Sequence, residues 1–473
     1  MNYQKIGLLA GAIVLLLLSI LVPMLGFLMW FAFIPFLLAI RNWTPAKSFF
    51  AGLFIGTVFF AALLYWINLY ESRIFAIVIT LVAPFFGLFG WLTNQLWQKT
   101  KNELLQAFIP PIVWFAVAFI YLLTPLEIIS DQIAFIQAPL FPAIVRLIGI
   151  SGITFLILLV NSFIALWLAT KRRIYLRGVL VAFFVLVFGV LIHPPPAKTK
   201  PIKVAIVQHN FPIPADWRML HRKDITLVYE KAIRELGRTA DLIVFPQYGL
   251  PVDALREPEW LNGLAKLTNT SILLGTYIPE LRGSRIGGGK QFDTALLFSP
   301  DRPVQDYRAV TPPPFRHIGQ IRGTKRNPLV LNDIKVGVML CYEDVRPEEG
   351  KLWVKTGAEL LVALSNPGHF LGTPLPRYHL LHDRIRAIET GRFVIRASPN
   401  GFSAIINPNG KILTQSRLNE ETILKGVVYP ETKATLFTQT GTVFAPVSAL
   451  LSLILLVNNY GRASMKRLAR KTR

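Results

Sequence analysis

Long apolar runs fill the first 193 residues of the chain, and they constrain its fold more than any other feature. Short polar breaks separate them, and each run comes close to the roughly 20 apolar residues that a helix needs to cross a bilayer. Hydrophobic residues make up 53% of the whole chain. We therefore expect a polytopic α-helical membrane domain with about eight transmembrane helices. The expected helices are 6–21, 24–40, 49–69, 74–91, 105–123, 147–169, 178–192 and 441–457.

The basic residues between these runs predict the orientation of the helices. Lysine and arginine concentrate in every second loop, as they do on the cytoplasmic side of membrane proteins. The breaks after the second, fourth and sixth runs are basic, as is the C-terminal tail, whereas the intervening breaks carry acidic residues such as Glu127 and Asp131. We expect both termini in the cytoplasm. A formal net charge of +23 often indicates nucleic-acid binding; here the membrane topology explains it, and no nucleic-acid partner is expected.

The character of the chain changes after "HPPPAKTKP". Short β-rich runs such as "IKVAIVQ", "SILLGTYI" and "ELLVALSN" alternate with helix-like segments such as "ITLVYEKAIRELG", a pattern typical of an α/β domain. We expect seven transmembrane helices and a linker in 1–200, an extracytoplasmic α/β domain in 201–434, and the last transmembrane helix with a basic tail in 435–473.

The single cysteine, Cys341, follows the apolar run "IKVGVML" and precedes Tyr342 and Glu343. A lone cysteine permits no internal disulfide and no Cys-rich metal site, and neither a metal nor a cofactor is expected. Buried structural cysteines are common. However, the ends of strands that open into loops are where α/β folds place reactive groups, so Cys341 is also a candidate nucleophile.

The order of the surrounding segments resembles the nitrilase, or carbon-nitrogen hydrolase, superfamily. "VAIVQHNFP", "DLIVFPQYGLP", "FDTALLFSP", "VGVMLCYED", "GAELLVALSN", "RIRAIETGRFVIRASPNGFSAIINPNGKI" and "TLFTQTG" follow one another as in its apolipoprotein N-acyltransferase branch. The resemblance implies an αββα sandwich between the seventh and eighth membrane helices. It also implies a bacterial inner-membrane enzyme of lipoprotein biosynthesis, with membrane phospholipid and a lipoprotein as partners.

In that family the cysteine takes an acyl chain from a phospholipid as a thioester and passes it to the N-terminal amine of a diacylglyceryl-cysteine lipoprotein. A glutamate in a Trp/Phe-Pro-Glu turn is the base, and a lysine in a Tyr-x-Lys stretch helps to hold the oxyanion. The present chain departs at both positions. Gln247 occupies the position of the glutamate, and Ala309 occupies that of the lysine. Neither side chain can do the corresponding chemistry.

Three interpretations therefore remain open. The chain is a catalytically degenerate relative (a pseudoenzyme) that binds lipid or lipoprotein; or the site is rebuilt with His317 or His369 as the base; or the register is shifted, so that Arg308 or Lys290 takes the role of the lysine. A membrane-tethered amidase is a further alternative, although it needs the same missing groups. Glu343 is expected to support the site, with a salt bridge to Arg346 as the simpler interpretation. His379 and His382 are spaced as a surface or site-lining pair on a helix, not as a metal site.

Overall fold

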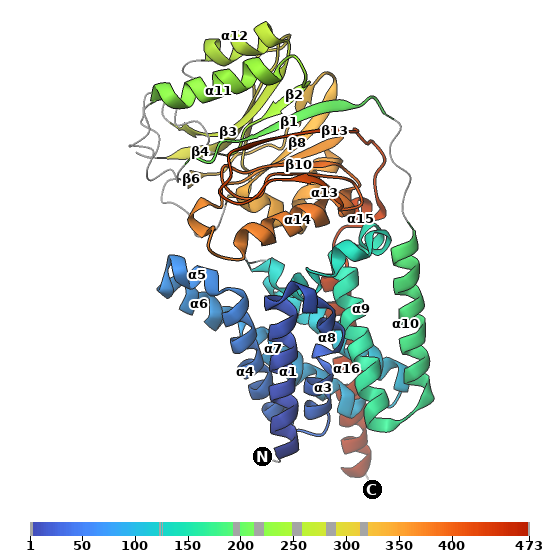
Figure 1. Ribbon diagram of the computed structural model, residues 1–473. Helices are drawn as coiled ribbons and strands as arrows, with labels where there is room; N and C mark the ends of the chain where they lie inside the picture. The colour runs from blue at the N-terminus through green and yellow to red at the C-terminus, as the bar shows by residue number, and fades with distance from the viewer. Residues whose placement is uncertain are drawn as a thin grey trace. The chain divides into compact units, whose positions relative to one another are not determined.

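The structure is a computed structural model that describes residues 3–122, 124, 126–192, 199–211, 222–247, 258–280, 290–312 and 320–471. The chain divides into two compact units. The helical unit comprises residues 1–192 and 442–473, and the α/β unit comprises 193–441. Figure 1 shows helices alone in the first unit and two sheets with helices in the second.

Within the described part of the chain, seven helical spans of the helical unit are long and apolar enough to cross a membrane. The eighth expected segment forms the apolar first half of α16, in which the apolar stretch Phe444–Asn458 is shorter than the other seven. The spans are α1 (Tyr3–Leu21), η1–α3 (Pro23–Ile40, made of η1, Pro23–Leu28, α2, Met29–Ala32, and α3, Ile34–Ile40), α4 (Pro45–Leu63), α6–α7 (Ser72–Val82 and Pro84–Lys99), α8 (Glu103–Tyr121), α9 (Pro142–Thr170) and α10 (Arg173–Leu191). The sequence therefore predicted the helices correctly but not all their bounds. The expected run 49–69 divides into α4 and α5 (Tyr65–Tyr70).

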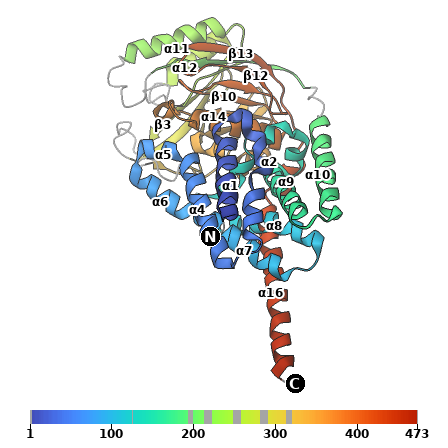
Figure 2. The same cartoon turned by 60° about the horizontal axis from the view of Figure 1, so that its bottom comes forward.

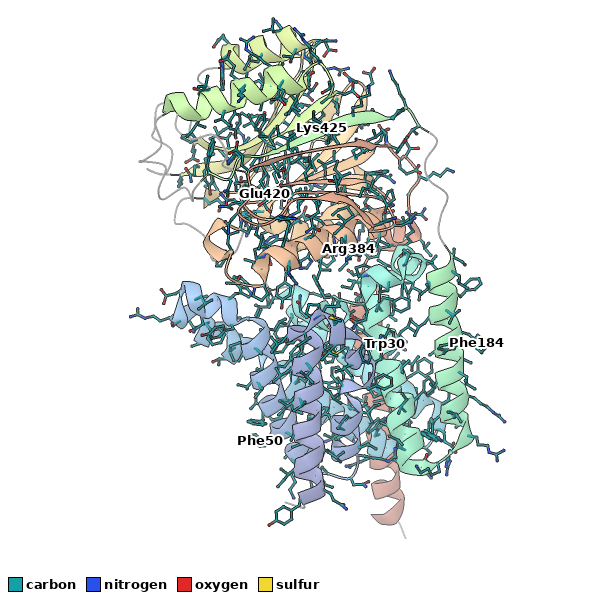
Figure 3. The ribbon with its side chains drawn as sticks, viewed as in Figure 1. Trp30, Phe50, Phe184, Arg384, Glu420 and Lys425 are labelled. Atoms are coloured by element: carbon teal, nitrogen blue, oxygen red, sulfur yellow. The ribbon has the colours of Figure 1, made fainter. Side chains whose placement is uncertain are left out.

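Small residues bring the helices of this unit into close contact. A Cβ atom added to Gly56 of α4 would lie 2.6 Å from the carbonyl oxygen of Ala83, and one added to Gly90 of α7 would lie 2.7 Å from that of Ser48. Such small-residue contacts are typical of membrane helices. The outward side chains are apolar, as the labelled Phe50 and Phe184 illustrate (Figure 3), and they are 66% and 67% exposed. The surface of the unit is therefore suited to a lipid environment.

Two contacts join the basic loops of the helical unit. Arg172, between α9 and α10, forms an ion pair with Glu103 at the start of α8, and the Lys5 ammonium lies 5.2 Å from the ring centre of Trp43. The basic segments that the sequence assigns to one side of the membrane thus meet in pairs.

Asp131, expected in a polar loop, is instead buried and accepts hydrogen bonds from Ser151 and Thr154 at 2.9 and 2.8 Å.

The α/β unit contains two sheets. The first has the strand order β13-β1-β2-β3-β4-β5, with β6 paired to β4, and the second has the order β12-β11-β10-β9-β8-β7. Figure 2, turned by 60°, shows α11 and α12 on the outside of the first sheet. The strands are β1 (Ile202–Gln208), β2 (Leu242–Val244), β3 (Ser271–Pro279), β4 (Gln291–Phe298), β5 (Gln305–Arg308), β6 (Gln320–Ile321), β7 (Leu329–Leu331), β8 (Ile334–Leu340), β9 (Leu360–Leu364), β10 (Val394–Ala397), β11 (Ala404–Ile406), β12 (Ile412–Gln415) and β13 (Thr422–Val428).

Helices cover both outer faces of this pair of sheets. Residues of α11 (Arg222–Leu236) and α12 (Pro258–Thr268) share a core with alternate residues of the first sheet. The helices α13 (Pro347–Lys355) and α14 (Leu375–Thr390) cover the second sheet (Figure 1). Side chains on the inner faces of both sheets form a second core between the sheets. The predicted αββα sandwich is therefore confirmed.

Alternation along β4 and β5 decides which side chains enter the space between the sheets. Ala295 and Leu297 of β4 belong to the core between the sheets, whereas Leu296 and Phe298 belong to the helix-covered core. Successive side chains of a strand point to opposite faces. Asp293, two residues before Ala295, therefore shares the face that meets the second sheet.

Candidate active site

Cys341 lies where β8 ends and the short helix η5 (Cys341–Val345) begins. Its backbone is left-handed, with φ of 49°. This conformation costs a non-glycine residue about 1–2 kcal/mol, and strained backbone is concentrated at functional sites. Cys341 is also only partly buried. Its backbone strain and partial exposure fit a candidate nucleophile better than a core side chain.

Glu343 joins this turn to the end of β5. Its Oε2 accepts a hydrogen bond from the backbone N–H of Leu340 at 3.0 Å. Its Oε1 accepts from the Tyr307 hydroxyl at 2.7 Å and from the N–H groups of Val310 and Thr311 at 2.9 and 3.1 Å. Burial and the nearby Glu349 carboxylate raise the pKa of Glu343 to about 8, although these hydrogen bonds act in the opposite direction. The side chain is fully buried and acts as a brace between the two sheets.

Gln247 follows β2 and is fully buried. Its Nε2 donates to Oδ2 of Asp293 at 2.6 Å, and its Oε1 accepts from the backbone N–H of Asn366 at 3.0 Å. Asn366 lies two residues beyond Leu364, which pairs with Leu340 in the neighbouring strand. Gly275 makes room for the turn, because a Cβ there would lie 2.7 Å from the Gln247 Cα atom. Gln247 thus connects the first sheet to the strand beside Cys341.

Ala309 lies between two of the residues that bind Glu343, and its side chain belongs to the core between the sheets. Its N–H donates to the carbonyl oxygen of Asp293 at 2.8 Å. The register of β4 and β5, with Ala295 opposite Tyr307, continues to set Ala309 opposite Asp293. Positions 247, 309 and 341 are therefore linked around one end of the sandwich.

The alternative cations do not lie in this arrangement. Arg308 alternates with Tyr307 and Ala309, so that its side chain takes the opposite face of the sheet. There it pairs with Asp306 at 3.1 Å and stacks over Phe292. Lys290 is exposed and lies 4.0 Å from Glu280. The interpretation in which either residue replaces the lysine is disfavoured by this geometry.

The histidines proposed as bases cannot be compared with these residues, because His317 and the side chain of His369 lie outside the described part of the structure. His379 and His382 of α14 are both buried rather than on the surface. The Nδ1 atom of His379 lies 2.8 and 2.9 Å from the two carboxylate oxygens of Asp344. Burial, followed by Arg386, lowers the pKa of His382 well below its ordinary value, so His382 is neutral.

Arg396 completes a buried charged network beneath η5. Its Nη1 lies 3.1 Å from Asp344 and 2.5 Å from Asp383, and its Nη2 donates to the hydroxyl oxygen of Ser365. Burial raises the pKa of Asp383 to about 7, against the opposing effect of Arg396. Through Asp344, the network holds the short helix η5 that begins at Cys341. Among the described residues, no group of three or more histidine, cysteine or acidic side chains is arranged to hold a metal ion.

Sequence reasoning did not single out Asp293, Asp344 or Arg396. The signal was present for Asp293, because a carboxylate inside the apolar run "QFDTALLF" is rarely buried without a specific partner. Asp344 gave no comparable signal. It lies in the polar segment "CYEDVRPEEG", in which a solvated charge is the ordinary expectation.

Comparison with known proteins agrees with this architecture. Residues 203–435 match the carbon-nitrogen hydrolase family, and residues 12–163 match the apolipoprotein N-acyltransferase N-terminal domain. The apolipoprotein N-acyltransferase of Geobacter metallireducens is 26% identical over 91% of both chains. That of Nitrosomonas europaea is 27% identical over 71% of both chains.

Solved structures are similar to about half of the chain. A carbon-nitrogen hydrolase from Helicobacter pylori covers 48% of this chain and 89% of its own, with 16% identity and a TM-score of 0.41. Nit3 of Saccharomyces cerevisiae covers 53% of this chain and 98% of its own, with 25% identity and a TM-score of 0.39.

The membrane-length helices, the two-sheet unit and the two family matches define a polytopic membrane protein that carries a carbon-nitrogen hydrolase domain. Both halves have their counterparts in one group of relatives, over most of the chain. The chain belongs to the apolipoprotein N-acyltransferase family of the nitrilase superfamily.

Proposed function

We propose that the protein transfers an acyl chain from a membrane phospholipid to the N-terminal amine of a diacylglyceryl-cysteine lipoprotein, through a thioester on Cys341. The Cys341 sulfur would attack the phospholipid ester carbon, and the lysophospholipid would leave with the thiol proton. The lipoprotein amine would then attack the thioester and release the thiol. Splitting one difficult acyl transfer into two easier steps is the advantage of covalent catalysis.

The observation that carries this proposal is the conformation of Cys341. The protein maintains a left-handed backbone at a non-glycine residue and holds the preceding N–H group on the buried Glu343 carboxylate. A structural cysteine in a core has no need of this strain. Glu343 is proposed to support the reaction by fixing the turn that carries Cys341.

We further propose that the protein lies in the inner membrane of a bacterial cell, with the α/β unit outside the cytoplasm and both termini inside it. The basic loops support this orientation. The pairs Arg172–Glu103 and Lys5–Trp43 bring together loops that the distribution of charge assigns to the cytoplasm. The membrane helices also favour a lipid substrate over the small amide of a tethered amidase.

A second candidate function is supported by Gln247 and Ala309. Loss of a positioned base costs about 10²–10⁴ in rate, and loss of an oxyanion donor costs about 10²–10³. With an amide and a methyl group at these positions, the chain would be a degenerate relative that binds lipid or lipoprotein without acylating it.

Acyl transfer to a synthetic diacylglyceryl-cysteine peptide would distinguish the two. The purified protein is mixed with phospholipid in detergent micelles, and the N-acylated peptide and the lysophospholipid are measured by mass spectrometry. The proposed reaction yields both products in equal amounts, and neither with Cys341→Ser. An unmodified peptide that nevertheless binds to the protein would support the binding function.

A further inference from the structure

Asp293 places a carboxylate one hydrogen bond from the position at which the family has its base. The Gln247 amide donates to Oδ2 of Asp293 at 2.6 Å. Asp293 is 1% exposed and faces the space between the two sheets. Through Gln247 it is linked to Asn366, beside the end of β8 that carries Cys341. The site therefore contains a carboxyl group on strand β4, although the loop after β2 has none.

Two chains of contacts tie Asp293 to the turn that carries Cys341. The first runs from the Asp293 carboxylate through Gln247 to the N–H of Asn366, beside the end of β8. The second runs from the Asp293 carbonyl group to Ala309, whose neighbours Tyr307 and Val310 donate to Glu343.

Glu343 and Asp344, two other buried carboxyl groups near the site, hold structural groups in place. Glu343 accepts four hydrogen bonds, and Asp344 binds His379 and Arg396. The Gln247 amide can donate to a carboxylate but cannot take a proton at neutral pH. Of the described acidic side chains around the site, Asp293 is the one that faces the space between the sheets beside Gln247 and Ala309.

We infer that Asp293 is the general base of the site and that Gln247 is a positioning residue that orients its carboxylate. This inference rests on the proposed acyl transfer. The Cys341 thiol gives its proton to Asp293 directly or through one water, and the sulfur forms a bond with the phospholipid acyl carbon. As the ester C–O bond breaks, the Asp293 carboxylic acid returns the proton to the leaving alkoxide. In the second half, Asp293 takes the proton of the attacking amine and returns it to the departing thiolate.

The decisive experiment moves the carboxyl group from position 293 to position 247. Asp293→Asn removes this group with little change of shape, and the double variant with Gln247→Glu and Asp293→Asn, called the exchanged pair, places a carboxyl group at position 247. Asp306→Asn, an exposed aspartate on neighbouring β5, is the matched control. Each full-length variant is assayed for the rate of acyl adduct formation on Cys341 with phospholipid micelles, and for the rate of Cys341 alkylation by iodoacetamide.

Asp293→Asn should slow adduct formation about 10²-fold or more, and the exchanged pair should recover to within about tenfold of the original rate, as expected for a positioned base. Alkylation should fall and recover in the same order, while Asp306→Asn matches the original protein. In Asp293→Asn the remaining alkylation should rise about tenfold per pH unit below the ordinary thiol pKa near 8.5.

Two results would overturn the inference. One is an unchanged rate in Asp293→Asn, and the other is a loss that the exchanged pair does not recover, which would make Asp293 a structural residue. Iodoacetamide separates this failure from failure of the proposed function. If the original protein forms no acyl adduct but its alkylation still depends on Asp293, the base is correct and the substrate is wrong.

Discussion

Removal of the Glu343 carboxylate should destabilise the α/β unit severely. Glu343→Ala would leave the buried backbone N–H of Leu340 and the partly buried N–H groups of Val310 and Thr311 without this acceptor. Each unsatisfied buried donor costs about 1–3 kcal/mol, so the three together cost up to about 3–9 kcal/mol, less whatever water restores to the two partly buried groups. Part of this cost is offset because a buried carboxyl group no longer has to be desolvated. The net loss is still comparable to the 5–15 kcal/mol typical of a folded domain.

Glu343→Gln is the informative companion. Its carbonyl oxygen can still accept from donors that Oε1 serves, whereas its NH2 group replaces Oε2 and cannot accept from the Leu340 N–H. Loss of that acceptor costs about 1–3 kcal/mol. Thermal unfolding in detergent micelles, followed by tryptophan fluorescence, should therefore rank the original protein above Glu343→Gln and Glu343→Gln well above Glu343→Ala. Glu421→Ala, at an exposed glutamate, should leave the transition unchanged. Equal stability of Glu343→Ala and Glu343→Gln would refute the brace.

Three further predictions concern the same unit. The pKa of Glu343 is raised from 4.5 to about 8, so its contribution to stability is full below pH 4.5 and is lost as the pH rises to about 8. Unfolding scans across this pH range should show that the stability of the protein declines, and that it declines less in Glu343→Gln. A stability that rises with pH would contradict this prediction. Because the backbone of Cys341 is left-handed, Cys341→Gly should be more stable than Cys341→Ala by about 1 kcal/mol, whereas alanine is usually the more stabilising of the two residues. Denaturant unfolding measures the difference. A more stable Cys341→Ala would show that the turn is unstrained. Arg396→Met would leave Asp344 and Asp383 buried without their counter-charge and should cost about 3–5 kcal/mol; a smaller effect than that of the exposed Arg417→Met in the same scans would exclude the network as a support of the site.

The sequence predicted the helices and strands well because their signals are local. Apolar runs of membrane length and short β-rich runs such as "IKVAIVQ" require no knowledge of distant residues, and β1 spans that run. The ends of the helices were harder to predict where a side chain caps the helix. Helix α4 starts at Pro45, whereas the expected run starts at residue 49, because the Thr44 side chain accepts a hydrogen bond from the Lys47 N–H and caps the helix.

The contacts around Cys341 were much harder to predict. Cys341 and Glu343 are neighbours in the chain, and motif and position identified them. The Gln247–Asp293 hydrogen bond joins residues 46 positions apart, and the Arg396–Asp344 pair joins residues 52 positions apart. Such partners are set by the order of the strands within each sheet, which brings distant segments of the chain side by side. A single sequence shows only that Asp293 is unusual for a buried strand.

Intact-protein mass spectrometry shows directly whether Cys341 carries an acyl group. The purified protein and Cys341→Ser are incubated in phospholipid micelles, and their masses are measured. We expect one added acyl mass on the original protein, removed by hydroxylamine, and none on Cys341→Ser. An unchanged mass, under conditions in which an active relative of the family gains an acyl group, would contradict acyl transfer through Cys341 and favour a lipid- or lipoprotein-binding protein.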